Sequence, residues 1–184
     1  MVCTKAQGAT ARRLCYTVAA LAMIASATNA VAGEDIVRPA PFEVHIELEK
    51  ATYKLGEPFS FTVTANQDCY FLVFTIDPND QVELHDPVAS RAYMGHPLLK
   101  AGERREIPVP DAPGRAVITP PTGPYQMSAV CSREDLAKLG LNRTELTEPA
   151  EAGQRSFQIH LDEKLSRVEH GVVTRATVSY EVRP

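Results

Sequence analysis

The segment YKLGEPFSFTVTA at residues 53–65 and the segment DCYFLVFTID at residues 68–77 decide the expected fold. Apolar and polar side chains alternate over residues 59–65, which is the pattern of a strand with one buried face and one face toward water. Residues 69–76 are almost continuously apolar and rich in aromatic and β-branched side chains, which predicts a strand buried on both faces. Gln67 and Asp68 turn the chain, so the two segments are predicted to form a central hairpin.

Further strands are predicted on both sides of this hairpin. They cover residues 42–49, 81–85, 116–119, 125–131, 157–161 and 174–182, with short edge segments at 98–103 and 106–110. Residues 132–140 carry a helix signature, with Ser132 as N-cap and Gly140 as stop. Residues 145–153 are polar and acidic and are expected to be exposed. The pattern predicts an all-β fold, an antiparallel β-sandwich of the immunoglobulin-like kind with one short helix.

The first 32 residues have the layout of a secretory signal peptide. Lys5, Arg12 and Arg13 precede an apolar run at residues 14–27, and small residues at 30–32 offer a cleavage site. The twin-arginine continuation is missing, which favours the general secretion route. We therefore expect a signal peptide at residues 1–32, a single β-sandwich domain at residues 33–184, and a periplasmic or secreted location.

Composition narrows the classes of partner. The formal net charge is −4, the pI is near 5.7, and no basic block is present, so nucleic acid and anionic membranes are poor candidates. No segment after the signal peptide is long and apolar enough to span a bilayer, so no membrane insertion of the mature chain is expected.

The mature chain keeps two cysteines, Cys69 and Cys131, which are 62 residues apart. Both lie in predicted core strands, and an exported protein is exposed to oxidising conditions, so a disulfide between them is expected. The alternative is a pair of buried free thiols that pack as small apolar side chains.

Several of these segments resemble the bacterial domain-of-unknown-function family DUF4384. The resemblance covers about residues 47–131 and rests on YKLGE at 53–57, DCYF at 68–71, ID at 76–77, AGE at 101–103 with IP at 107–108, and PPTG at 120–123. It implies an exported or envelope β-sandwich domain, found alone or attached to protease, kinase or repeat modules, with no established activity of its own.

The candidate site is the irregular loop at residues 86–97, together with the residue before it. His85, Asp86, Arg91, Tyr93, Met94 and His96 offer mixed polar and apolar contacts to a protein partner. His85, Asp86 and His96 are also conceivable metal ligands, although no short ligand spacing supports them and neighbours on a strand point to opposite faces. No Gly-x-Ser-x-Gly nucleophile motif is present.

These observations favour a non-catalytic accessory module of the bacterial envelope that acts through protein binding and needs no cofactor. One alternative is a periplasmic metal-binding protein or enzyme that uses His85, Asp86 and His96. Another is an immunity-type inhibitor of a secreted effector, with which the acidic pI is weakly compatible.

Overall fold

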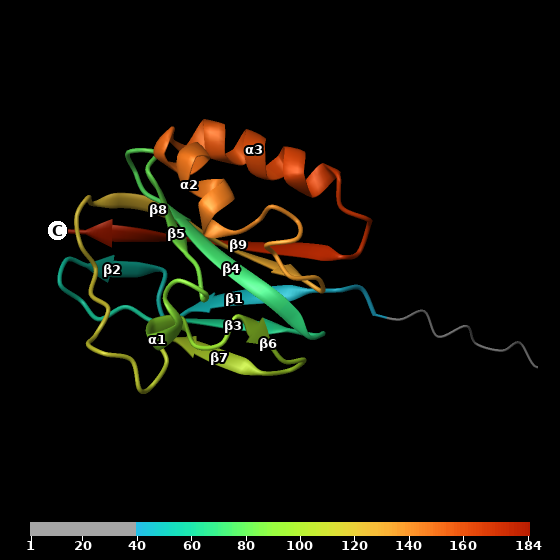
Figure 1. Ribbon diagram of the computed structural model, residues 1–184. Coiled ribbons are helices and arrows are strands. Elements are labelled where there is room, and N and C mark those ends of the chain that lie inside the picture. The colour runs from blue at the N-terminus through green and yellow to red at the C-terminus, as the bar shows by residue number, and fades with distance from the viewer. Residues whose placement is uncertain (1–39) are drawn as a thin grey trace, which may run out of the picture. The chain divides into compact units, whose positions relative to one another are not determined.

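Two β-sheets and three helices make up the described part of the chain, residues 40–184 of the computed structural model (Figure 1). The strand order is β1-β3-β7 in the smaller sheet and β2-β9-β8-β4-β5 in the larger sheet, where β6 also pairs with β4. The strands are β1 (Val44–Leu48), β2 (Thr52–Lys54), β3 (Phe61–Ala65), β4 (Cys69–Ile76), β5 (Val82–His85), β6 (Leu98–Leu99), β7 (Arg104–Ile107), β8 (Gly123–Ser132) and β9 (Val173–Arg183). The helices are α1 (Arg91–Met94), α2 (Arg143–Glu151) and α3 (Gln154–Ser166). The predicted signal peptide at residues 1–32 lies outside the described residues.

The prediction of a chain made mostly of β-strands is confirmed, but the pairing is not antiparallel throughout. β2 pairs with β9 in parallel, with Thr52 opposite Glu181. Phe42, just before β1, lies under the guanidinium of Arg133, whose backbone N–H donates to Val172 O (3.0 Å). The chain from residue 42 to β2 therefore runs alongside residues 172–183 in the same direction, and β2 reaches β9 without a reversal.

The expected hairpin between residues 59–65 and 69–76 is wrong, because these strands belong to different sheets. β3 pairs with β1 and β7, whereas β4 pairs with β5, β6 and β8. The reason lies in their faces: β3 has Thr62 and Thr64 on the face away from the core, whereas β4 is apolar on both faces. A strand that is apolar on both faces, as β4 is, needs packing layers on both sides. Residues 66–68 therefore carry the chain across to the larger sheet.

Two apolar clusters occupy the two faces of the larger sheet. The first fills the space between the sheets and includes Val63 from β3 and Phe71 and Val73 from β4. The second lies on the opposite face of β4, where Leu72 and Phe74 pack against side chains of α2 and α3. Figure 1 shows these two helices covering that face of the sheet. The prediction that residues 69–76 form a strand buried on both faces is confirmed.

The C-terminal helices replace a predicted strand and a predicted exposed segment. Residues 157–161 lie within α3, where Phe157 and Leu161 are buried one turn apart and Ile159 points to solvent. Residues 145–153 fall mostly in α2, whose N-cap Asn142 accepts a hydrogen bond from the N–H of Glu145 (3.1 Å). The alternation of apolar and polar side chains over residues 157–161 fits a strand. The structure shows a helix instead, in which Phe157 and Leu161, four residues apart, lie on the same buried face.

The helix predicted over residues 132–140 is also wrong. Ser132 ends β8, and its hydroxyl accepts a hydrogen bond from the N–H of Glu134 (3.1 Å). Asp135 accepts in the same way from the N–H of Ala137 (2.9 Å), and turns continue to Gly140. Side chains that accept hydrogen bonds from N–H groups two residues ahead favour turns. Here these hydrogen bonds form instead of the backbone hydrogen bonds of a helix.

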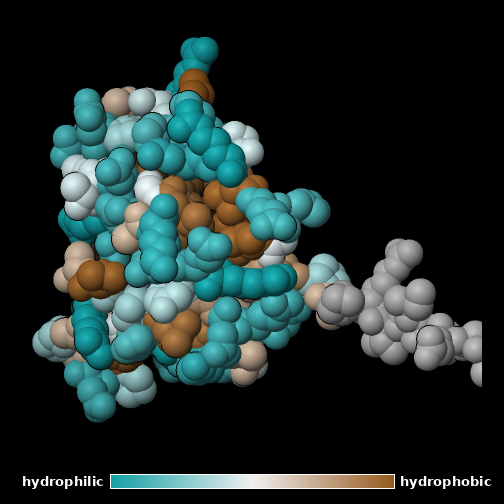
Figure 2. Space-filling model, turned by 45° about the vertical axis from the view of Figure 1, so that its right-hand side comes forward, coloured by the Kyte–Doolittle hydropathy of each residue, from teal (hydrophilic) through white to brown (hydrophobic). Residues whose placement is uncertain are grey.

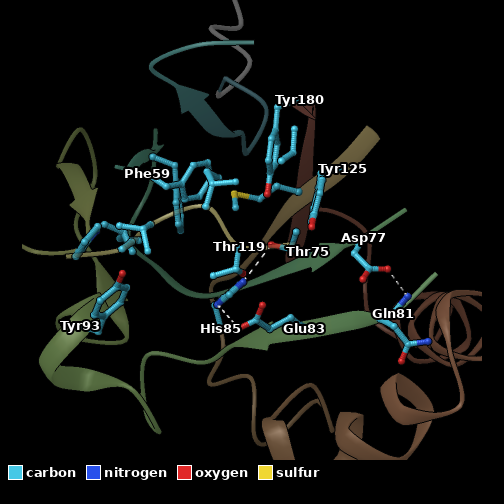
Figure 3. Close-up of a pocket in the computed structure, with 18 of the residues that line it drawn as sticks. Phe59, Thr75, Asp77, Gln81, Glu83, His85, Tyr93, Thr119, Tyr125 and Tyr180 are labelled. Carbon is cyan, nitrogen blue, oxygen red and sulfur yellow. Dashed lines mark hydrogen bonds and ion pairs between the residues drawn. The ribbon is translucent and has the colours of Figure 1, made fainter. Parts of the chain in front are cut away.

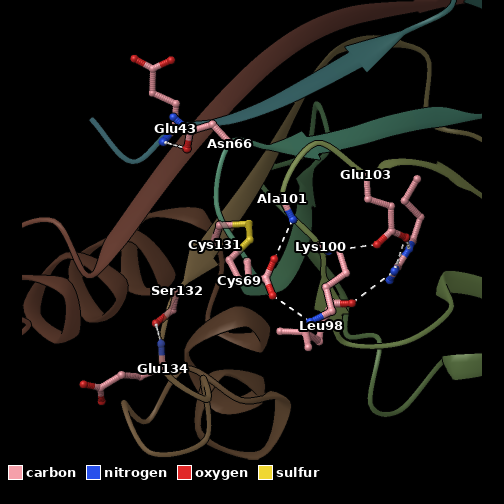
Figure 4. Close-up of a disulfide and its surroundings, with 12 residues drawn as sticks. Glu43, Asn66, Cys69, Leu98, Lys100, Ala101, Glu103, Cys131, Ser132 and Glu134 are labelled. Atoms are coloured by element: carbon pink, nitrogen blue, oxygen red, sulfur yellow. Dashed lines mark hydrogen bonds and ion pairs between the residues drawn. A yellow bond between two sulfur atoms is a disulfide. The ribbon is translucent and has the colours of Figure 1, made fainter. Parts of the chain in front are cut away.

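Cys69 and Cys131 form a disulfide, as predicted. The two residues lie on the neighbouring strands β4 and β8, with their Cα atoms 5.6 Å apart, and both are fully buried (Figure 4). Beside Cys69, the carboxylate of Asp68 accepts hydrogen bonds from Lys100 Nζ and from the N–H of Ala101, each at 2.8 Å. The start of β4 is thus tied covalently to β8 and by hydrogen bonds to the turn between β6 and β7.

The surface of the described residues is largely hydrophilic, with some apolar side chains visible in a hollow on the face shown in Figure 2. Large apolar side chains that are exposed are Leu55, Val88, Val117 and Ile159, which come from separate parts of the chain. Within residues 40–184, none of the helices has the length and apolar character that crossing a membrane requires.

Removal of the disulfide is expected to destabilise the fold. The double variant Cys69→Ala/Cys131→Ala opens a loop of 62 residues, which lowers the free energy of unfolding by about 4 kcal/mol in the chain-entropy account. Urea unfolding followed by circular dichroism measures the change. A reductant should lower the stability of the wild type and leave the double variant unaffected; equal midpoints for oxidised wild type and double variant would contradict the prediction.

The helical layer is expected to be an integral part of the fold. Phe157 is 0% exposed, and its ring meets Phe74 edge-on with centroids 4.8 Å apart, so Phe157→Ala should lower the free energy of unfolding by about 3–5 kcal/mol. Ile159→Ala is the matched control on the same helix, because Ile159 is 60% exposed and its loss should change stability by about 0.5 kcal/mol or less. Similar losses in both variants would show that α3 does not pack as described.

Candidate functional site

A pocket of about 640 Å³ opens between the two sheets, at the end of the core where β5, β8 and β9 meet the segment at residues 116–121 (Figure 3). This segment forms one wall, and backbone hydrogen bonds hold it to residues 56–57. The N–H of Ile118 donates to Glu57 O (2.9 Å), and the N–H of Gly56 donates to Ile118 O (2.8 Å). The pocket is therefore bounded by hydrogen-bonded structure on this side as well as by the sheets.

The floor of the pocket is aromatic. Tyr125 of β8 and Tyr180 of β9 are directly opposite in register, and their rings stack with centroids 5.1 Å apart. Phe59 lies against the other side of Tyr180, with the ring centroids 5.3 Å apart. Tyr53 then contacts Tyr180 edge-on at 5.7 Å, which completes the packing around this ring.

The opposite wall is polar, and it is built by β5 and the end of β4. Gln81, Glu83 and His85 alternate with Val82 and Leu84, and the two apolar side chains pack on the helical side of the sheet. Because side chains alternate along a strand, the three polar ones face the pocket. Thr75 and Asp77 extend this wall (Figure 3).

His85 is held in the polar wall in its neutral form. Its Nε2 lies 3.1 Å from the hydroxyl oxygen of Thr75, and its Nδ1 lies 3.9 Å from a carboxylate oxygen of Glu83. Burial lowers the pKa of His85 below its ordinary value, and the charge of Arg143 lowers it further, while Glu83 opposes both effects. The neutral imidazole is therefore the dominant form at pH 7.

The tyrosines of the pocket respond to negative charge. Burial is the main cause that raises the pKa of Tyr93, Tyr125 and Tyr180, and the charge of Glu83 raises all three further. Asp77 adds to the effect on Tyr125. The phenols stay protonated at neutral pH, and the charge of Glu83 acts on all three of them.

Thr75, His85 and Glu83 bring together the residue types of a hydroxyl, imidazole and carboxylate triad. In such a triad the carboxylate hydrogen-bonds the imidazole and orients it. Here Glu83 is 3.9 Å from the ring, and its side chain is 77% exposed. The Thr75 hydroxyl is buried within the central strand. The contact between Thr75 and His85 is therefore better explained as a hydrogen bond that fixes the imidazole than as an activated nucleophile with its base.

The loop residues predicted as a contact surface are divided between the pocket and its surroundings. His85, Tyr93 and Met94 line the pocket, the last two from the single-turn helix α1. Asp86 instead holds the loop: its side chain accepts from the N–H of Val88 (2.8 Å). Arg91 is exposed at the start of α1.

His96 is exposed at the far end of the same loop, and its Nδ1 accepts a hydrogen bond from the N–H of Leu98 (3.1 Å). The ring of His85 is engaged by Thr75 in the pocket wall. Within residues 40–184 no group of three His, Cys, Asp or Glu side chains is close enough to hold a metal ion. The arrangement of His85, Asp86 and His96 therefore does not favour the metal alternative.

Sequence reasoning missed the aromatic floor and most of the polar wall. Residues 174–182 are predicted as a strand, but nothing in that pattern indicates that Tyr180 lines a pocket. The available signal was in β5, where Gln81, Glu83 and His85 occupy one phase of the strand and Val82 and Leu84 the other. If Val82 and Leu84 pack under the helices, the polar residues that alternate with them must point to the opposite side of the sheet, toward the space between the sheets.

Comparison with known families agrees with the resemblance seen in the sequence. Residues 52–135 match the family described as "Domain of unknown function (DUF4384)". We refer to residues 52–135 as the DUF4384 segment. The DUF4384 segment contains every lining residue of the pocket except Tyr180 and Val182, which β9 contributes from outside it.

Among solved structures, the chain is similar to the sporulation control protein Spo0M from Bacillus subtilis, with 13% sequence identity and a TM-score of 0.32. The alignment covers 79% of this chain and 51% of the Spo0M chain, so the chain spans about half the length of that protein. A likeness at this level carries no argument about function. No curated protein matches the sequence.

The partial burial of His85 predicts a specific dependence of stability on pH. Because the folded-state pKa is lowered, the unfolded chain takes up a proton near pH 6.5 that folded His85 does not. The free energy of unfolding should therefore decrease as the pH falls through about 6.5 toward the lower folded-state pKa. Urea unfolding at a series of pH values measures this. In His85→Gln the decrease should be smaller than in the wild type, and identical pH profiles would refute the assignment.

Proposed function

We propose that the protein is an exported, non-catalytic accessory module of the bacterial envelope that binds a protein partner, with a side chain of the partner entering the pocket between the sheets. In this proposal the two sheets constitute an immunoglobulin-like β-sandwich, and the pocket is the open end of its core. The observation that carries the proposal is the composition of this pocket, with an aromatic floor opposite a polar wall.

The size and construction of the pocket support binding. Ligand pockets in proteins typically enclose about 300–1,000 Å³ and combine apolar surface with a few placed polar groups, and this one measures about 640 Å³. Its walls are strands and a segment held by backbone hydrogen bonds, so little ordering is required when a ligand enters. A core that needed only packing would place an apolar side chain at the position of His85, whose side chain is mostly buried.

The rim of the pocket supports a protein rather than an isolated small molecule as the partner. Val117 lines the pocket and is also one of the exposed large apolar side chains. Tyr93 also lines the pocket and is partly exposed, on the short helix α1. A tyrosine and an aliphatic side chain that border a pocket are typical of the contacts surrounding an anchoring side chain in protein interfaces.

A non-catalytic role is supported by the state of the groups in the polar wall. His85 is the only imidazole among the lining residues, and its Nε2 is already bonded to the buried Thr75 hydroxyl. Ser90 also lines the pocket, but no hydrogen bond between its hydroxyl and His85 is found among the described residues. A nucleophile and a base within hydrogen-bond reach, with the base oriented by a third group, are the usual signature of covalent catalysis.

Blocking the pocket tests this proposal. Thr119 is exposed, lines the pocket and is directed toward its polar wall (Figure 3), so Thr119→Trp should fill the opening without a change in the core. Thr122→Trp is the matched control, because Thr122 is exposed on the same segment and does not line the pocket.

The readout is crosslinking capture of partners from the native envelope by tagged protein, quantified by mass spectrometry. We expect one partner whose capture falls by about tenfold in Thr119→Trp, equivalent to about 1.4 kcal/mol, and is unchanged in Thr122→Trp. Equal capture by the two variants, or the absence of any reproducible partner, would contradict the proposal.

A further inference from the structure

We propose that the pocket selects a positively charged ammonium or guanidinium group carried on an apolar stem. This inference rests on the proposed function, because it assumes that the pocket is a binding site, and it adds the chemical class of the group that enters. Three independent features of the described residues carry it: the sign of the charges, the aromatic floor, and an unpartnered hydroxyl.

The charges that line the pocket are all negative at neutral pH. Asp77 and Glu83 contribute carboxylates, and no Lys or Arg occurs among the lining residues, all of which are described. One carboxylate oxygen of Asp77 accepts from the N–H groups of Asn79 and Gln81, each at 2.8 Å, which fixes the side chain without supplying a positive side chain. His85 stays neutral, so it does not offset these charges.

The effect of these carboxylates extends to the floor of the pocket. Glu83 raises the pKa of Tyr93, Tyr125 and Tyr180, which is the response expected where negative charge reaches across the space between the walls. The same field attracts a cation and repels an anion. Because the side chain of Glu83 is 77% exposed, dissolved salt screens part of this attraction.

The aromatic floor is suited to the same ligand. Phe59 and Tyr125 pack against Tyr180 and are themselves partly exposed, and ammonium and guanidinium groups are attracted to the faces of such rings. The rings also bury the apolar stem that carries the charge. A floor of this kind opposite two carboxylates is therefore complementary to a cation with an apolar stem.

The hydroxyl of Tyr180 supplies a specific contact. The residue is only 6% exposed, and Figure 3 shows its hydroxyl directed into the pocket. The Tyr125 hydroxyl donates to Pro121 O (2.9 Å), whereas among the described residues no partner is found for that of Tyr180. The Tyr180 hydroxyl is therefore free to accept a hydrogen bond from an N–H donor of a bound cation.

Binding of three benzyl compounds to the purified protein tests the inference. Benzylamine is cationic at pH 7, benzyl alcohol is a neutral compound of similar shape, and benzoate is anionic. NMR titration that follows the tyrosine and histidine rings measures each affinity. We expect benzylamine to bind roughly tenfold more tightly than benzyl alcohol, with benzoate weakest, and we expect added salt to reduce this preference.

Two variants locate the effect in the pocket. Glu83→Gln should reduce the preference for benzylamine over benzyl alcohol by several-fold, because it removes the charge and keeps the shape. Tyr180→Phe should weaken benzylamine binding while the aromatic floor stays intact. Glu163→Gln is the control, since Glu163 is an exposed carboxylate on α3 outside the pocket and should leave the preference unchanged.

A capped lysine, with its backbone amine and carboxyl blocked, distinguishes the two sources of such a group. If it binds as tightly as benzylamine, the cation is a side chain of a protein partner; if only benzylamine binds, it is a free amine. Both results support cation selection. Equal affinities for benzylamine and benzyl alcohol, or binding of neither, would overturn it. In that case a partner lost in Thr119→Trp would still support the pocket as a binding site, so the two proposals fail separately.

Discussion

The fold depends on the burial of one strand, β4, on both of its faces. Phe71 and Val73 point into the space between the sheets, and Leu72 and Phe74 point to the opposite side. Burial of a large apolar side chain contributes about 1.5–3 kcal/mol, so neither face can be left in water without a large loss of stability. The chain must therefore supply two covering layers, and it does so with the smaller sheet on one side and with α2 and α3 on the other.

The same constraint explains why one wall of the pocket is polar. β5 pairs with the end of β4, and its apolar residues Val82 and Leu84 are used to extend the layer beneath the helices. A strand has only two faces, so the other residues of β5 must face the space between the sheets. Glu83 and His85 are placed there as a consequence, and the core at this end is an open pocket rather than a closed layer.

The sequence predicted strands well where one physical rule was sufficient. The continuous apolar run at residues 69–76 and the alternation at residues 174–182 correspond to β4 and β9, because burial of a face is recorded directly in the order of residues. The pairing of Cys69 with Cys131 was predictable because both cysteines lie in segments expected to be core strands. Which sheet each strand joins was not, because β3 and β4 are adjacent in sequence and a short turn serves a hairpin or a crossing between sheets equally well.

The helices and the aromatic floor were missed for a different reason. A short pattern such as residues 157–161 fits a strand and a helix almost equally well. The helix forms because it covers the outer apolar face of β4. For the site, the loop pattern identified His85, Tyr93 and Met94, which do line the pocket. Tyr180 could not be found in this way, because it joins the pocket through strand pairing with a segment far away in sequence.

Because both faces of β4 must be covered, the folding unit extends beyond the residues that match the family. Residues 52–135 contain β4 and most of the pocket, but the side chains that cover Leu72 and Phe74 come largely from α2 and α3, which follow that segment. Phe157 of α3 contacts the ring of Phe74 edge-on. Strand β9 in turn supplies Tyr180 to the pocket and pairs with β8 along ten residues of register. The DUF4384 segment thus carries the central strand and the polar wall, while the chain after it completes both the second core and the floor of the site.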